Sequence, residues 1–412
     1  MTGTATKTNV YDNLLIILIV SLISGYAGGV VFSLVHVVEI AVLPFFLSCK
    51  RLFRRRIFSW LFLFAIIWLS YSVLSILWTS DVHRGAITAI MYCFRFLMCF
   101  EMLAFSMRAR KPLASISKGW FLAVALTAVV ALWEIFTDHH LAIAREADLG
   151  ALGMIVQRAQ ASVLFYNPNT YSLFLVMAFP FLAYRLASEK KKWMTIAAML
   201  VLLFIVIKDA SRGAILSLGV MTVMTLFFFM KRRKYRGYAV LSLLLLVALL
   251  AVFGSSLFSS FILRMESQGM QDGARFDIWA GAWQVFVKSH GLGTGVGSML
   301  SELGSLNRFG IAYAHCMLLE ALVEGGVLLA LLIILFLVKL FKAALAEQQK
   351  EVRLVLRMSM FTFPIYFIIN SEYLRPAFIW CFFMCLYLFA RHQKLQVSRP
   401  ARLNYTAPLT TD

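Results

Sequence analysis

Three ionisable residues able to handle a diphosphate stand far apart in this sequence: Arg212, Arg275 and His315. Two guanidinium groups can grip a diphosphate through paired, charge-assisted hydrogen bonds. A neutral imidazole can accept the proton of an attacking hydroxyl near physiological pH. Each residue also has an ordinary alternative: an interface anchor for Arg212, an ion pair for Arg275 and a structural role for His315. Their joint chemistry therefore depends on the elements that position them.

Those elements are predicted to be apolar helices. The chain has 412 residues, of which 61% are hydrophobic and 14% charged, whereas a soluble domain is about half apolar and a quarter charged. Apolar runs near the roughly 20 residues that cross a bilayer recur without the alternation of a β-barrel. The sequence thus predicts an all-α polytopic membrane protein. The twelve predicted spans are 13–29, 30–48, 57–78, 85–106, 119–136, 169–187, 193–207, 213–230, 237–262, 315–338, 355–370 and 376–390.

The basic residues fall mostly on one side of these spans. Of the 39 Lys and Arg residues, 27 lie on the side of both termini and ten on the other side. The positive-inside rule then predicts cytoplasmic termini and places the three candidate residues on the extracytoplasmic side. The net charge of +19 is explained by topology and by contact with anionic lipids, so no nucleic-acid partner is predicted.

Two long segments, 137–167 and 254–314, are predicted on the extracytoplasmic side, and loops of this length are usually functional or disordered. In the second, Phe276, Trp279 and Trp283 recur at helical spacing, which predicts an amphipathic helix along the membrane surface. Within the spans, Arg95 is either buried with Glu101 or faces a polar cavity.

Known cofactor and metal motifs are absent from the sequence. It contains no Walker motif, HExxH, zinc cluster or GxSxG, and the glycines of GLGTGVG lie outside any strand–helix unit. We therefore expect neither a cofactor nor a metal ion. The energy for any reaction must then come with the substrate.

Four sequence blocks carry a family resemblance. They are VLFYNPNTYSLFLVMAFPF with its Asn-Pro-Asn, DASRGAIL with its Ser-Arg-Gly, ARFDIWAGAWQVFVKSHGLGTGVGSML with its Arg-x-x-x-Trp and glycine loop, and AHCMLLEALVEGG with its histidine at a helix start. In this order, they resemble the O-antigen ligase and polysaccharide polymerase superfamily of bacterial membrane glycosyltransferases. The resemblance extends from about Leu164 to Leu340.

The resemblance implies metal-independent, inverting transfer of a glycan from undecaprenyl diphosphate, at the extracytoplasmic face of the bacterial cytoplasmic membrane. It implies that Arg212 and Arg275 bind the diphosphate and that His315 is the catalytic base. The chain departs from the family pattern at Cys316, where a polar residue usually follows the histidine, and lacks the second glycine after Gly326. Three secondary candidates are Arg158, Trp279 and Glu324.

The expected partners are a lipid-linked oligosaccharide donor, a glycan or lipid acceptor, membrane lipids, a flippase and a chain-length regulator. A polymerase is favoured over a ligase that couples the glycan to lipid A-core or another acceptor, because the histidine block departs from the ligase-like pattern. A small-anion transporter is the alternative from another class; the absence of an evident inverted repeat argues against it. The expected parts are N-terminal helices 1–163, a core 164–340 that includes the loop 254–314, C-terminal helices 341–390 and a cytoplasmic tail 391–412.

Overall fold

The computed structural model describes residues 9–24, 33–49, 56–141, 160–165, 167–189, 192–209, 211–231, 236–237, 240, 275–304, 306, 313–369 and 372–393. In these ranges the secondary structure is helical and contains no strand, which confirms the predicted all-α class for this part of the chain. Arg158, nearly all of the predicted span 237–262 and the tail from 394 onward lie outside the described residues.

The first half of the chain forms five helices. The start of α1 is fixed by the buried Asp12, whose carboxylate accepts the backbone N–H groups of Arg110 and Lys111 and the Ser115 hydroxyl. These bonds join the first helix to the turn that separates the fourth from the fifth. The helices are α1 (Val10–Val20), α2 (Leu34–Leu47), α3 (Arg56–Leu74, continued by the 3₁₀ turn Ser75–Leu77), α4 (Val82–Arg108) and α5 (Pro112–Thr137).

The second half is arranged around one buried helix, α7. Nearly all of its residues are buried, because α5, α8, α9 and α13 pack around it. A further helix covers residues 275–288. The others are α7 (Pro168–Ser188), α8 (Trp193–Asp209), α9 (Arg212–Met230), α11 (Met299–Leu303), α12 (Met317–Ala346), α13 (Lys350–Tyr366) and α14 (Ala377–Ala390).

Six helices of the described part are long and apolar enough to cross a membrane, so the chain is a multi-pass membrane protein. The other predicted spans with described residues form shorter helices: α1, α2, α8, α13 and α14. The six helical stretches are Ser59–Leu77, Val82–Arg108, Pro112–Thr137, Pro168–Ser188, Arg212–Met230 and Met317–Ala346.

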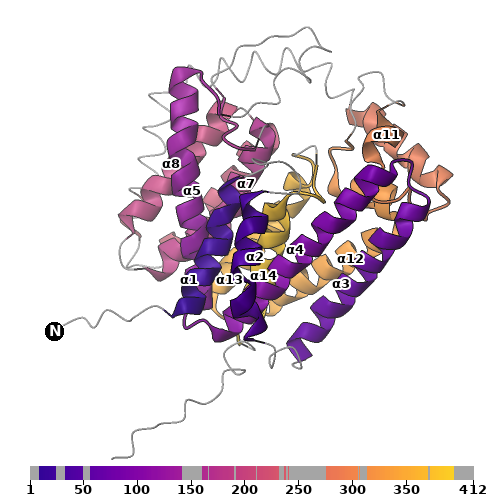
Figure 1. Cartoon of the computed structure of the whole chain (residues 1–412). Coiled ribbons are helices and arrows are strands. Elements are labelled where there is room, and N and C mark those ends of the chain that lie inside the picture. Colours follow the sequence, from indigo (N-terminus) through magenta and orange to yellow (C-terminus); the bar gives the residue numbers. More distant parts are fainter. Residues whose placement is uncertain are drawn as a thin grey trace, which may run out of the picture.

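The bundle has two chemically different ends. We call the end at which α4, α7, α9 and α14 begin the loop end, and the opposite end the basic end. α1 begins at the basic end, and α11 lies at the loop end (Figure 1). The charge asymmetry predicted from the sequence recurs here, because described residues such as Arg108, Lys111 and Lys350 lie at the basic end.

Helix α12 is interrupted at Gly326, whose φ of 60° and ψ of −162° are not helical. At its start, the Met317 N–H donates to the Phe367 carbonyl just after α13 (3.2 Å). Before the interruption, the Glu324 carbonyl accepts the Tyr71 hydroxyl from the end of α3 (2.8 Å). Residues 317–325 therefore cross the loop end from α13 to α3, and we call them the crossing segment. The remaining 327–346 have the length of one membrane crossing.

The glycine-rich loop fixes this interruption. Gly293 has φ +83°, and a β-carbon on it would collide with the backbone N of Gly326. We expect Gly293→Ala to destabilise the protein by roughly 1–3 kcal/mol, because an L-residue is strained there and the two backbones must separate. Gly219→Ala in α9 is the matched control, since nothing lies within 4 Å of its β-carbon position. A thermal unfolding temperature in detergent that fell equally for both variants would contradict the prediction.

Candidate functional site

A small second core positions the candidate residues at the loop end. It joins the helix 275–288, α11, the residue before His315 and the crossing segment. The Trp279 indole N–H donates to the Ala314 carbonyl (2.9 Å), which ties the helix that carries Arg275 to the turn that carries His315. Trp279 thus holds the two segments together. The core residues are Ala282, Val285, Met299, Leu303, Ala314 and Val323.

His315 lies in an unusual backbone conformation, with φ 51°. Its Nδ1 atom is buried and has no hydrogen-bond partner among the described residues. Burial, together with the nearby charge of Arg275, lowers the pKa of His315 from 6.5 to about 4. The imidazole is therefore neutral at physiological pH, which is the form that can accept a proton.

Arg212 is the first residue of α9. The N–H groups at a helix start and the helix dipole favour an anion, and a guanidinium there adds to this preference. The turn before Arg212 is held by Asp209, whose buried carboxylate accepts the Ala161 N–H (2.9 Å) and the Ser172 hydroxyl (3.0 Å). Asp209 therefore fixes the segment that presents Arg212.

The three predicted residues lie on segments at the loop end of the bundle. Arg275 acts electrostatically on His315. Arg212 is joined to them through the end of α13: a β-carbon on the adjacent Gly213 would lie 2.7 Å from Ile369, and the crossing segment binds the same turn at Phe367. The start of α9 and the start of the crossing segment thus both lie beside the turn that follows α13.

The Asn-Pro-Asn block has a local structural role. Asn167 is the N-cap of α7 and its side chain accepts the Asn169 N–H (2.8 Å), while Pro168 occupies the first helical position. Both features stabilise a helix start. This motif begins the central helix, which packs beside α9.

A buried charge cluster lies beside the crossing segment. Glu320 accepts the Tyr373 N–H (2.8 Å), and Glu324 accepts the Met299 N–H (3.3 Å). The Arg375 guanidinium lies 3.9 Å from Glu324 and 3.2 Å from Glu372. The cluster connects the crossing segment to α11 and to the turn before α14. Glu324, a secondary candidate in the sequence, is therefore part of the framework.

Sequence reasoning missed most of this cluster. The available signal was a pair of carboxylates four residues apart at the start of a long apolar helix, which must be compensated when buried. The partner Arg375 lies some fifty residues later and has no distinguishing local pattern. Within the described ranges, no three His, Cys, Asp or Glu side chains come together as a metal site.

Arg95 belongs to the same framework. Its Nε donates to the Arg375 carbonyl (3.0 Å), and its guanidinium donates to His36 Nε2 (2.9 Å). The other ring nitrogen of His36 faces the Ser33 hydroxyl (3.2 Å). Of the two alternatives open from the sequence, burial with Glu101 describes this position, because both side chains are buried. Arg95 also connects α4 to α2 and to the turn before α14.

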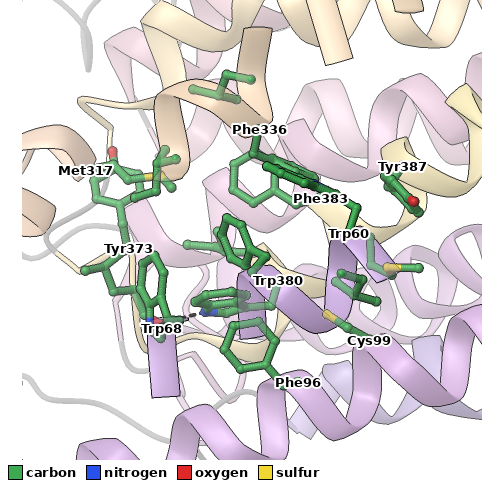
Figure 2. Close-up of a pocket in the computed structure, with 17 residues that line it drawn as sticks. Trp60, Trp68, Phe96, Cys99, Met317, Phe336, Tyr373, Trp380, Phe383 and Tyr387 are labelled. Atoms are coloured by element: carbon green, nitrogen blue, oxygen red, sulfur yellow. Dashed lines mark hydrogen bonds between the residues drawn. The ribbon is translucent and has the colours of Figure 1, made fainter. Parts of the chain in front are cut away.

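An apolar groove runs inside the bundle below the crossing segment, between α3, α4, α12 and α14 (Figure 2). Its interior volume is about 60 Å³, and its lining is almost entirely apolar. Met317 and Tyr373 lie at one end, Trp68 and Trp380 in the middle, and Tyr387 toward the other end. The groove thus begins two residues from His315.

Cys316, the departure from the family pattern, is the N-cap of α12 and makes no capping hydrogen bond with its side chain. Cys316→Asn is expected to stabilise the protein by about 1 kcal/mol, because an Asn side chain accepts N–H groups of the first helical turn. The unfolding temperature in detergent should rise for this variant and stay level for Cys316→Ala. An equal response of the two variants would show that the cap contributes nothing here.

Comparison with known proteins finds a matching family model and a similar sequence. Residues 197–334 match the family model described as O-antigen ligase, and this range contains Arg212, Arg275 and His315. The matched range contains three of the four blocks, the Asn-Pro-Asn block lying before it, and it supports the predicted resemblance to the O-antigen ligase and polysaccharide polymerase superfamily. Among individual relatives, the teichuronic acid biosynthesis protein TuaE of Bacillus subtilis (strain 168) is 22% identical over 342 residues, which cover 78% of this chain and 69% of that protein. The two findings support a membrane polysaccharide polymerase or ligase in general.

Proposed function

We propose that this protein transfers a glycan from a polyprenyl diphosphate donor to an acceptor hydroxyl at the loop end of the bundle. The observation that carries the proposal is the apolar groove, which is lined at one end by Met317, two residues after His315 in the chain. An isoprenoid tail is apolar, and the almost entirely apolar lining of the groove suits contact with it. We place the tail against this lining and the diphosphate toward Arg212 and Arg275 at the loop end.

In the proposed reaction, His315 removes the proton of the acceptor hydroxyl while its oxygen attacks the anomeric carbon. The bond between that carbon and the diphosphate breaks in the same step, so the configuration inverts. Arg212 and Arg275 stabilise the charge that grows on the leaving diphosphate, which lowers the barrier without a metal ion.

Donor binding would also change the pKa of His315. Arg275 lowers the pKa of His315 in the free protein. An anionic diphosphate beside Arg275 offsets that positive charge, so the pKa of His315 rises when the donor binds. The imidazole is then a stronger base at the moment when a proton has to be removed.

The proposed location is the cytoplasmic membrane of a bacterium, with the basic end in the cytoplasm and the loop end on the extracytoplasmic side. The basic end carries most of the described Lys and Arg residues, as the positive-inside rule requires of a cytoplasmic surface. Lys339 covers the ring of Trp60 at this end of the groove, where a snorkelling ammonium reaches the lipid headgroups. A flippase and a chain-length regulator would be the functional neighbours of such an enzyme.

Between the two acceptor classes we favour a polymerase that extends lipid-linked repeat units. The relative is named for teichuronic acid biosynthesis, which supports polysaccharide synthesis. The family description names ligation, and a ligase that couples finished glycan to another acceptor is the second candidate.

A reconstituted assay tests the proposal. Purified protein in liposomes is given polyprenyl-diphosphate-linked repeat units with metal ions chelated. Release of polyprenyl diphosphate with longer glycans is expected for a polymerase, and release only after a second acceptor is added would indicate a ligase. If no polyprenyl diphosphate is released with or without a second acceptor, and anions are taken up into the liposomes, the protein would be a transporter and not an enzyme.

The groove can be tested separately with a donor that carries a photoreactive group in its isoprenoid tail. We expect crosslinks to α3, α12 and α14, at side chains such as Trp68, Phe336 and Trp380. Crosslinks confined to the outer surface of the bundle would remove the groove from the donor site.

A further inference from the structure

The helix 275–288 has an exposed apolar stripe. Phe276, Trp283 and Val287 are 67%, 53% and 54% exposed, and Ala280 is exposed beside them. At about 100° per residue, these four side chains fall within an arc of roughly 60°. An uncovered stripe of this size in water would be unfavourable.

Two other faces complete the helix. Asp277, Gln284 and Lys288 are exposed and lie together on a second, polar face. The third face is buried, with Ala282 and Val285 in the small core at the loop end. The helix therefore has one face that packs on protein, one exposed polar face and one exposed apolar face. This pattern is expected for a helix that lies at the membrane–water boundary and packs on the protein with its third face.

The depth of this helix is fixed by its contacts with α12. The Gly291 carbonyl, just after the helix, accepts the Val327 N–H (2.9 Å). Val327 is also where the surface of α12 changes: the crossing segment before it is largely buried, while Val327, Leu328 and Leu331 are exposed. The helix therefore ends at the level where the lipid-facing part of α12 begins.

A second contact gives the same level. The Trp78 indole N–H donates to the Gly293 carbonyl (3.1 Å), and Trp78 is itself half exposed at the end of α3. Tryptophan at a helix end is typical of the membrane–water boundary. Leu292, 68% exposed, continues the apolar surface between these two contacts.

We propose that the stripe Phe276, Ala280, Trp283 and Val287 binds the lipid bilayer surface, in the leaflet at the loop end. The stripe is continuous through Leu292 with the lipid-facing surface of α12, which identifies its occupant as lipid. The proposal does not rest on the proposed reaction, because it concerns only the position of the helix relative to lipid.

The test compares neighbouring positions on the two exposed faces. A fluorescent, environment-sensitive amino acid is introduced at residue 283 or 287 on the stripe, and at 284 or 288 on the polar face, in the full-length protein in liposomes. We expect lipids brominated near the headgroup to quench emission strongly at 283 and 287, with emission shifted to shorter wavelength. Aqueous iodide should quench emission at 284 and 288.

Two results would overturn the proposal. Equal iodide quenching at all four positions would show that the stripe faces water. Protection of 283 and 287 from both quenchers would show that a protein segment covers it. Neither quenching measurement depends on catalysis. The lipid contact can therefore be confirmed when no glycosyl transfer is found, and it can be excluded when transfer is found.

Discussion

Replacement of His315 by asparagine is expected to reduce glycosyl transfer by at least about 10²-fold, the usual contribution of a general base. Asparagine is the appropriate substitution because His315 has φ 51°, and asparagine tolerates this left-handed region better than alanine. The loss should therefore come from the missing base. Turnover in the reconstituted assay measures the effect, and size-exclusion chromatography in detergent checks the fold.

The chain offers a matched control. His290 also has φ 51° but is exposed after the helix 275–288, outside the proposed site. His290→Asn should retain transfer. Full activity in His315→Asn would remove the histidine base from the mechanism, and equal losses in both variants would point to a general effect of these substitutions on the loop end.

Substitution of Arg275 should change both the rate and its pH dependence. The neutral form of His315 is competent as a base, so kcat/KM is expected to fall as the pH drops through the pKa of about 4. Arg275→Gln removes a positive charge that lowers this pKa. The acidic limb of the plot of kcat/KM against pH should therefore move to higher pH. It should stay below 6.5, because burial still lowers the pKa. Turnover itself should fall by roughly 10²–10³-fold through lost transition-state stabilisation.

Arg275→Lys separates the two effects. A lysine keeps the positive charge but cannot form a bidentate grip, so turnover should fall while the acidic limb stays near its original pH. Lys288→Gln, on the polar face of the same helix, should change neither. An acidic limb that did not move in Arg275→Gln would show that Arg275 does not act on His315.

Much of this site was accessible from the sequence because its signals are local. Apolar runs and their length predicted membrane helices, and the stretch around Phe276 and Trp283 predicted an amphipathic helix. Three of the four blocks contain the predicted site residues Arg212, Arg275 and His315. The tertiary role of Trp279 as a bond to Ala314 was not predicted, because a hydrogen bond between segments 35 residues apart leaves no periodic signal.

The sequence by itself determined the helical membrane class and the asymmetry of charge, and it predicted Arg212, Arg275 and His315 as site residues, since each depends on composition or short-range spacing. Only the tertiary structure decided that α12 turns at Gly326, that Arg375 compensates Glu324 and that the groove begins at Met317. The physical reason is that a buried charge or an interrupted helix is tolerated only when distant segments supply the missing partners, and those partners are chosen by packing.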